Sequence, residues 1–237
     1  MTSIILAVEC GGDFFSAAVN KKGVMMQLSS AEVKDTSDFG GDSQRHSSLA
    51  LPLTRSVLEM AEVRLEDCDA FAFGVGPGRF SGLRMACALA QSFGYAKQRP
   101  VIAVPSLPAL AYANYGADGE NVAAAYAALP AHRGHAFLAR CRFRHGRWRS
   151  ARPVIAEEED MIAQVRARHC CGAGFINMPQ ETVAHLLLSD RAKEPNAAAV
   201  AAIAAAMFAD GETTSPLACA PLYVRHRVAK TVAERHH

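Results

Sequence analysis

A glycine-rich segment, GPGRFSGLR at residues 76–84, is the first place in this sequence where chemistry could be performed. An apolar strand candidate ends there and a helix candidate begins, and free backbone N–H groups at such a junction can cradle a phosphate. The segment lacks the Gly-Lys-Ser/Thr of a Walker loop and the G-x-G-x-x-G spacing of a dinucleotide fold. The residues alone favour a tight structural turn over an anion site, made by Gly76, Pro77, Gly78 and Gly82.

Histidines and cysteines offer few candidates for a metal site or a nucleophile. His132 and His135 are close in sequence, but no Cys, Asp or Glu flanks them at ligand spacing, so loop histidines are favoured over ligands. The cysteines are odd in number, scattered and without a Cys-x-x-Cys pair, which indicates reduced core thiols; they are Cys10, Cys68, Cys87, Cys141, Cys170, Cys171 and Cys219. We therefore expect neither a metal nor another cofactor.

Arginines recur along two adjacent strand candidates in the second half of the chain. With 25 Lys and Arg against 23 Asp and Glu, the formal charge of +2 gives no global reason to bind nucleic acid or membranes, so any RNA contact must be local or indirect. The alternation predicts a basic patch on one sheet face, with a solvated face as the simpler alternative. Its members are Arg140, Arg142, Arg144, Arg147, Arg149 and Arg152.

The elements that carry these residues alternate as in an α/β protein. Apolar runs and turn residues predict the order β-β-α-β-α-β over about the first 110 residues, followed by three strands and two helices. The length of 237 residues, 50% of them hydrophobic, suits two lobes, which we place at 1–112 and 113–237, with the last residues packing back on the first lobe. The N-terminus lacks a signal-peptide pattern and no apolar run reaches about 20 residues, so a cytoplasmic protein is expected.

Two helices of the first half have wide apolar surfaces. In the helix over 47–62, apolar residues span roughly 200°, against the roughly 100° that covers one core. One stripe of this helix holds Leu49, Leu53, Val57 and Met60, and the neighbouring stripe holds Leu51, Thr54, Leu58 and Ala61. We expect the first stripe to face a partner, although the two could be exchanged. Pro52 begins or bends the helix.

The helix over 82–97 is expected to begin after an N-cap at Ser81. Because this helix has few polar positions, we expect two neighbouring elements of structure to pack against it and bury it.

Taken as a string, GPGRFSGLR resembles the sequence signature of the TsaB (YeaZ) family. Further matches follow in family order and extend over essentially the whole chain. They are ILAVE and SAAV in the first strands, Arg45-His46-Ser47-Ser48, Val104-Pro105-Ser106-Leu107, Gly172-Ala173-Gly174, Pro195 with its Ala-rich helix, and Pro221-Leu222-Tyr223-Val224-Arg225.

The resemblance implies a two-lobed actin-like ATPase-domain (ASKHA, ribonuclease H-like) fold, with mixed sheets flanked by helices. It also implies a non-catalytic scaffold subunit that binds and activates the catalytic subunit TsaD, in an assembly with the ATPase TsaE. The product would be threonylcarbamoyladenosine (t6A) at adenosine 37 of tRNAs that read codons starting with A, with indirect tRNA contact. A homodimer is expected in the absence of TsaD.

The partner interface implied by the resemblance lies on the two helices and the turn between them. Its expected members are Arg45, His46, Leu49, Leu53, Val57, Met60, Arg79, Phe80, Ser81, Leu83, Arg84 and Cys87. The partner subunit uses a metal held by a His-x-x-x-His pair, and the corresponding positions here are Ser106 and Leu110, which cannot replace imidazole ligands.

The chain departs from the family pattern at two places. The first strand ends in Glu9-Cys10-Gly11 instead of Asp-Thr-Ser, and Pro130-Ala131-His132 stands for Asp-Ala-Arg. Both departures argue against nucleotide binding by this chain alone. The alternatives are an actin-like ATPase or kinase and a glycoprotease-like metallopeptidase. The sequence has no second Gly-rich adenosine motif and no His-Glu-x-x-His to support them.

Overall fold

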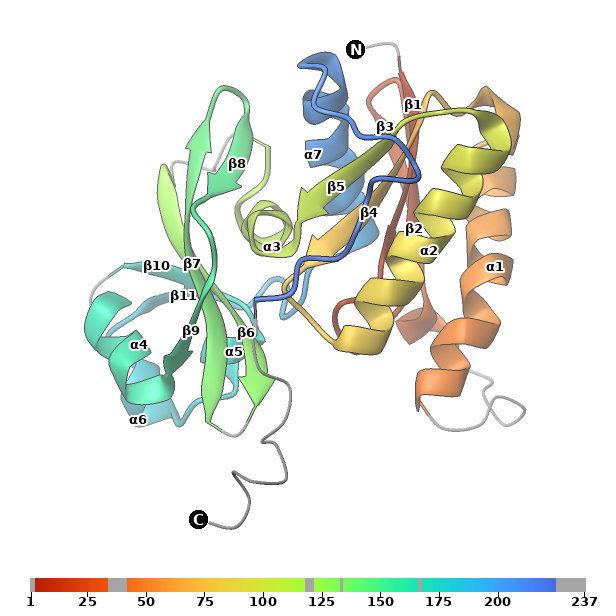
Figure 1. Ribbon diagram of the computed structural model, residues 1–237. Helices are drawn as coiled ribbons and strands as arrows, with labels where there is room; N and C mark the ends of the chain where they lie inside the picture. The colour runs from red at the N-terminus through yellow and green to blue at the C-terminus, as the bar shows by residue number, and fades with distance from the viewer. Residues whose placement is uncertain (1–2, 34–41, 118–121, 133, 166–167, 225–237) are drawn as a thin grey trace, which may run out of the picture.

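Two mixed β-sheets, one from each half of the chain, organise the molecule (Figure 1). The computed structural model describes residues 3–33, 42–117, 122–132, 134–165 and 168–224, apart from the side chains of 42–46, 158 and 159. The expected α/β class with helix-flanked mixed sheets is confirmed.

The first sheet has the strand order β3-β2-β1-β4-β5. Its strands are β1 (Ile4–Glu9), β2 (Ser16–Lys21), β3 (Val24–Ser29), β4 (Ala70–Gly76) and β5 (Val101–Pro105). The first three are antiparallel, whereas β1, β4 and β5 run parallel. The expected pattern lacked β3. This strand follows a two-residue turn in which Lys22 (φ 57°) and Gly23 (φ 95°) both have positive φ, the geometry that turns a strand back on its neighbour.

The second sheet has the order β11-β10-β6-β7-β8, with β9 paired to β7. Its strands are β6 (Ala124–His132), β7 (His135–Arg144), β8 (Arg147–Ser150), β9 (Val154–Glu157), β10 (His169–Cys171) and β11 (Leu187–Ser189). Strands β8 and β9 both pair with β7, side by side along its length. The Ala-rich segment that begins β6 is therefore a strand despite its helix propensity, because it is held between β7 and β10.

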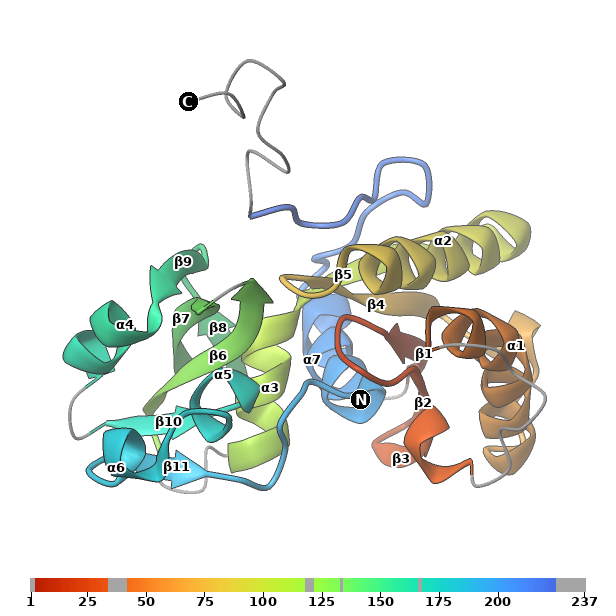
Figure 2. The ribbon, with the colours of Figure 1, turned by 90° about the horizontal axis from the view of Figure 1, so that it is seen from below.

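Helices cover both faces of the first sheet (Figure 2). On one face lie α1 (Asp42–Met60) and α2 (Phe80–Lys97); on the other lie α3 (Ser106–Tyr115) and α7 (Ala197–Ala209). The core around α3 and α7 continues onto the second sheet, so these two helices join the sheets. The shorter helices are η1 (Ser30–Glu32), η2 (Leu65–Asp67), α4 (Glu158–Val165), α5 (Ala173–Ile176) and α6 (Gln180–Val183).

The start of α2 differs from the expected capping. The helix begins at Phe80, and Arg79 occupies the N-cap with no side-chain hydrogen bond, so the prediction of Ser81 as N-cap is wrong. It ends as Gln98 adopts a left-handed conformation (φ 52°). Pro52 lies inside α1, which continues through it.

The last described part of the chain returns to the first sheet. Helix α7 packs on β1 and β2, Thr214 exchanges backbone hydrogen bonds with Val101 at 2.8 and 2.9 Å, and the Leu222 N–H donates to the Val75 carbonyl at 2.8 Å. The boundary between residues 112 and 113 stays a prediction. Among the described residues, none of the helices combines the length and the hydropathy that crossing a membrane requires.

Candidate functional site

The GPG turn packs directly against the turn that follows β1. The Arg79 N–H donates to the Gly11 carbonyl at 2.7 Å. A Cβ added to Gly78 would touch the backbone of Gly11, and one added to Gly82 would collide with the Cys10 carbonyl. Gly78 and Gly82 therefore permit a close approach of the two turns that a side chain would block. Gly76 is the member of the turn that needs a positive φ, at 114°.

Glu9 fills the space behind this contact. Its carboxylate is 1% exposed, and Oε1 accepts the Gly11 N–H at 2.6 Å. On the other side, the Ser106 hydroxyl donates to Oε2 at 3.5 Å and accepts the Gly76 N–H at 3.1 Å. Burial away from water raises the pKa of Glu9 to about 7, although the hydrogen bond from Gly11 opposes the shift. The Ser106 hydroxyl, at the start of α3, thus connects Glu9 at the end of β1 with Gly76 at the end of β4.

A second carboxylate lies beside the same turn. Glu194 accepts the Asp13 N–H at 2.7 Å, and Asp13 forms an ion pair with Arg79. Burial raises the pKa of Glu194, and the nearby Asp13 carboxylate adds to the shift. Glu9, Asp13 and Glu194 thus lie close to the turn after β1, and the Arg79 guanidinium is already paired with Asp13, an arrangement that disfavours a phosphate.

A cavity of about 500 Å³ opens on the outer side of the GPG turn. Its lining joins the turn and the start of α2 to the second sheet and to the end of the described chain. The lining residues are Pro77, Gly78, Arg79, Phe80, Leu83, Pro130, Ala131, His132, Phe137, Ile155, Leu222, Tyr223 and Val224. Most of these side chains are apolar. His132, one of the expected departures from the family pattern, lies on its wall.

The interface residues expected on α2 divide into an exposed set and a buried set. Arg79, Phe80, Ser81 and Arg84 are exposed, whereas Leu83 and Cys87 are buried. The Arg84 guanidinium lies 5.1 Å from the centre of the Phe80 ring, which in turn lies 5.4 Å from the ring of Tyr223. An exposed aromatic and cationic cluster therefore marks the N-terminal end of α2.

The stripe of α1 that was expected to face a partner mostly faces the protein's own sheet. Leu49, Leu53 and Val57 belong to the core on β1, β2 and β4, so these three cannot form a free surface. Of that stripe, only Met60 is exposed, at 52%. On the neighbouring stripe, Leu51 is 58% exposed and Leu58 is half-buried, whereas Thr54 and Ala61 are buried.

Two further interface predictions, Arg45 and His46, concern side chains outside the described ones. Their role stays a prediction.

A groove of about 770 Å³ separates α1 from α2 and contains apolar residues that were not predicted as interface residues. Leu51 and Leu58 line it from α1, and Phe93 lines it from α2. Phe93 was missed because it lies near the C-terminal end of α2, where the family signature offers no match. The width of the apolar arc on α1 was the signal that could have identified Leu51.

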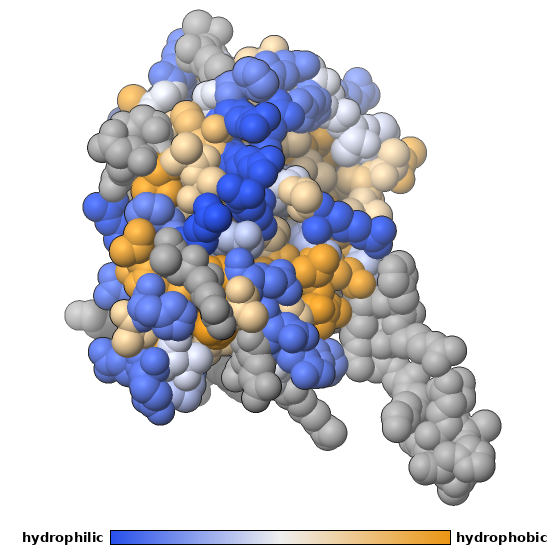
Figure 3. Space-filling model, turned by 90° about the vertical axis from the view of Figure 1, so that its left-hand side faces the viewer, coloured by the Kyte–Doolittle hydropathy of each residue, from blue (hydrophilic) through white to orange (hydrophobic). Residues whose placement is uncertain are grey.

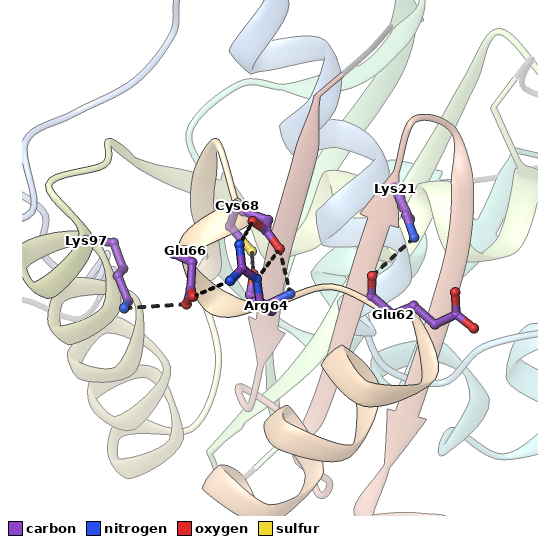
Figure 4. A network of polar contacts seen from close by, with 7 residues as sticks. Lys21, Glu62, Arg64, Glu66, Cys68 and Lys97 are labelled. Carbon is purple, nitrogen blue, oxygen red and sulfur yellow. Dashed lines mark hydrogen bonds and ion pairs between the residues drawn. The ribbon is translucent and has the colours of Figure 1, made fainter.

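A polar network holds the connection after α1 in place, and its member Arg64 lines the groove (Figure 4). The Lys21 ammonium donates to the carbonyl oxygens of Ala61 and Glu62, at 2.8 and 3.3 Å. Arg64 pairs with Glu66 and Asp67, and Glu66 also lies 3.8 Å from the Lys97 ammonium at the end of α2. These exposed pairs add little stability each. They join the segment after α1 to β2 through Lys21 and to the end of α2 through Lys97.

The positions that correspond to the partner's metal ligands lie at the buried start of α3. Ser106 and Leu110 are both fully buried, and the Ser106 hydroxyl is occupied by Glu9 and Gly76. The rings of His132 and His135 stack with centres 4.7 Å apart. Within the described residues, no group of three or more His, Cys, Asp and Glu side chains is arranged to hold a metal ion.

Comparisons with known proteins relate the chain to two protein families of t6A biosynthesis. Residues 28–186 match the sequence model of the family described as TsaD, tRNA N6-adenosine threonylcarbamoyltransferase. The tRNA threonylcarbamoyladenosine biosynthesis protein TsaB of Haemophilus influenzae is 30% identical over 195 residues, which cover 77% of this chain and 81% of that protein.

Two solved structures of Pseudomonas aeruginosa proteins extend the match to three dimensions. One is described as similar to peptidase YEAZ, is 25% identical and has a TM-score of 0.77 over 94% of this chain and all of the other. The second, YeaZ, is 26% identical with a TM-score of 0.75, over 93% and 99% of the two chains. The first sheet has the ribonuclease H-like order of the actin-like ATPase-domain fold. The chain belongs to the TsaB (YeaZ) family.

Proposed function

We propose that this protein is a non-catalytic scaffold subunit of t6A biosynthesis. In this role it binds TsaD and activates the transfer of the threonylcarbamoyl group to adenosine 37 of tRNA, within an assembly that also contains TsaE. The name of the H. influenzae relative supports the pathway, and the match to the TsaD family supports a partner of related fold.

The observation that carries the non-catalytic role is the position of the Glu9 carboxylate. It accepts the Gly11 N–H, one of the backbone donors of the turn after β1 that could otherwise bind a phosphate. A nucleotide phosphate at this turn would have to displace Glu9 and lie beside Glu194. Like charges at such short range oppose binding. This supports a chain that depends on its partner for chemistry.

The partner surface that the geometry supports best is the exposed side of α1 and α2. It combines the groove around Leu51, Leu58 and Phe93 with the exposed Phe80 and Met60. An apolar groove between two helices suits a helix of a related subunit. In the absence of TsaD, a second copy of the chain would cover the same surface.

The absence of independent catalysis is tested with the purified chain alone. We expect phosphate release from ATP and cleavage of an unfolded protein substrate to equal the blank, because Glu9 occupies the turn. Adding the chain to TsaD, TsaE and tRNA should instead raise t6A formation. ATP turnover by the chain alone that disappears in Glu9→Gln would support the ATPase or kinase alternative. Cleavage of the protein substrate would support the metallopeptidase alternative.

The partner surface is tested by size-exclusion chromatography with TsaD from the same organism. Leu51→Asp should abolish co-elution with TsaD, since it places a charge in the groove. Leu187→Asp is the matched control, because Leu187 is similarly exposed (55%) but lies on β11 of the second sheet. Equal co-elution of both variants with TsaD would place the interface elsewhere.

A further inference from the structure

Three arginines form a row along β7 on the outer face of the second sheet. Arg140, Arg142 and Arg144 are exposed, and they alternate with the buried Cys141 and the half-buried Phe143 on the inner face. Figure 3 shows strongly hydrophilic side chains gathered in a band on the side of the molecule formed by this sheet. A two-residue repeat in a strand spaces the Cα atoms of these arginines at about 6.7 Å along β7.

The neighbouring strand carries arginines of a different kind. Arg147 is only 3% exposed, and it pairs with Asp210 and Glu212. Arg149 reaches the same two carboxylates at 3.7 and 3.3 Å. The six-arginine patch expected from the sequence is therefore divided, because these two arginines hold β8 to the end of α7.

The row on β7 has no such compensation. Among the described residues, no carboxylate lies within ion-pair distance of Arg140, Arg142 or Arg144. Arg149, which lies opposite Arg142 in the register of β7 and β8, is neutralised by its own carboxylate partners. The row on β7 thus presents positive charge that no described carboxylate compensates, which suits an anionic ligand.

The geometry of the row points to a nucleic-acid backbone as that ligand. Each guanidinium group of the row can form paired hydrogen bonds with one phosphate. A row of arginines at regular positions along a strand therefore suits the repeating phosphates of a nucleic acid better than the irregularly placed carboxylates of a protein surface. Tyr126 on β6 lies opposite Arg140, and it is half-buried against the core under α4, so the row begins where that core ends. We propose that Arg140, Arg142 and Arg144 bind the phosphate backbone of RNA.

The choice of RNA over DNA rests on the proposed function in t6A biosynthesis. The inference that the arginine row binds a nucleic-acid backbone does not depend on that function. Direct contact through this sheet differs from the indirect tRNA contact that the family resemblance implies. The surface lies on the second sheet, whereas the proposed TsaD surface lies on α1 and α2 of the first. Both contacts can therefore form at the same time.

Fluorescence anisotropy with a labelled, unmodified tRNA transcript tests the proposal on the full chain. The triple variant Arg140→Gln, Arg142→Gln, Arg144→Gln should bind at least ten-fold more weakly than wild type. The slope of log affinity against log salt should fall by about 2 to 3, since each lost phosphate contact removes about 0.7 to 0.9. The single variant Arg142→Gln should lower the slope by about 1. It perturbs the fold least, and circular dichroism of both variants should match wild type.

A second triple variant controls for the loss of charge alone. Lys22→Gln, Arg99→Gln, Lys193→Gln removes three exposed positive charges away from β7 and should leave tRNA binding within two-fold of wild type. Equal losses in the two triple variants, no tRNA binding by wild type, or unchanged binding by the row variant would overturn the proposal. Displacement of tRNA by polyglutamate at equal charge concentration would also overturn it, in favour of an acidic protein ligand.

Co-elution of the row variant with TsaD separates this proposal from the proposed function. We expect normal TsaD binding with weakened tRNA binding. If wild type fails to bind TsaD while the row still determines tRNA affinity, the scaffold role fails and the RNA surface stands. A row variant that loses TsaD instead of tRNA would overturn the RNA surface.

Discussion

Gly78 and Gly11 lie so close together that a Cβ on Gly78 would be 2.6 Å from the Gly11 carbonyl oxygen. The backbone of the turn after β1 thus occupies the space that a side chain at position 78 of the GPG turn would need. The Arg79 N–H completes the contact with a hydrogen bond to the same carbonyl. The GPG sequence is needed here for packing, before any role in recognition.

Replacing Gly78 should therefore destabilise the protein. Gly78→Val would force the two turns apart, and overpacking of this kind costs about 1 to 3 kcal/mol. We expect a melting temperature several degrees below wild type, measured by circular dichroism. Ala88→Val, at an exposed position of α2, is the control and should change the melting temperature little. A Gly78→Val protein that melts like wild type but fails to bind TsaD would make the turn a recognition site.

The buried and the exposed apolar positions of α1 should respond in opposite ways to an introduced charge. Leu53→Asp and Val57→Asp place a carboxylate in the core on the first sheet, which costs several kcal/mol and should unfold the protein. Leu51→Asp and Met60→Asp alter exposed positions and should keep the wild-type circular dichroism spectrum while preventing self-association. If all four variants unfold, Leu51 and Met60 are buried in the free protein as well, and this side of α1 is not a partner surface.

Glu9 should make the stability depend on pH. Its pKa is raised from 4.5 to about 7 in the folded state, so folding favours the protonated carboxyl. The stabilisation is full below about pH 4.5 and is lost as the pH rises through about 7, a loss on the order of 3 kcal/mol. Glu9→Gln cannot ionise, so its urea midpoint should fall less than that of wild type between about pH 5 and about pH 8. Glu181→Gln, at an exposed carboxylate, should retain the wild-type dependence.

All seven cysteines should be protected in the native state. Each is buried and unpaired by disulfides, and burial raises the pKa of Cys10 and of Cys68 to about 12. Because the thiolate is the reactive form, modification by Ellman's reagent should be slow in buffer and should reach seven groups per chain in denaturant. Rapid modification of Cys10 in the native protein would contradict the closed packing of the turn after β1.

The sequence was sufficient for the elements that have a local signature. The glycine turn and the helices that became α1 and α2 could be read from turn chemistry and periodicity. Helix α3 was missed because Leu107, Ala109, Leu110 and Ala111 are all fully buried. A helix surrounded by apolar neighbours has no polar face to reveal its period.

The orientation of α1 could not be predicted for a related reason. Both halves of an apolar arc of roughly 200° are apolar enough to pack on a sheet, so the sequence does not show which half does so. Only the packing of α1 on β2 and β3, which brings Leu49, Leu53 and Val57 into the core, decides it. The ion pairs of Arg147 and Arg149 with Asp210 and Glu212 join residues more than 60 positions apart, which periodicity cannot reveal.

The return of α7 to the first sheet determines when that sheet can fold during synthesis. Until residues 197–209 leave the ribosome, the face of β1 and β2 that carries Ile5, Ala7 and Ala18 has no helix to cover it. The nascent chain must wait for nearly all of its length before its first strands are buried. Contacts of such long sequence separation slow folding and lengthen the exposure of apolar surface. A chaperone that binds the emerging N-terminal half would act during this interval.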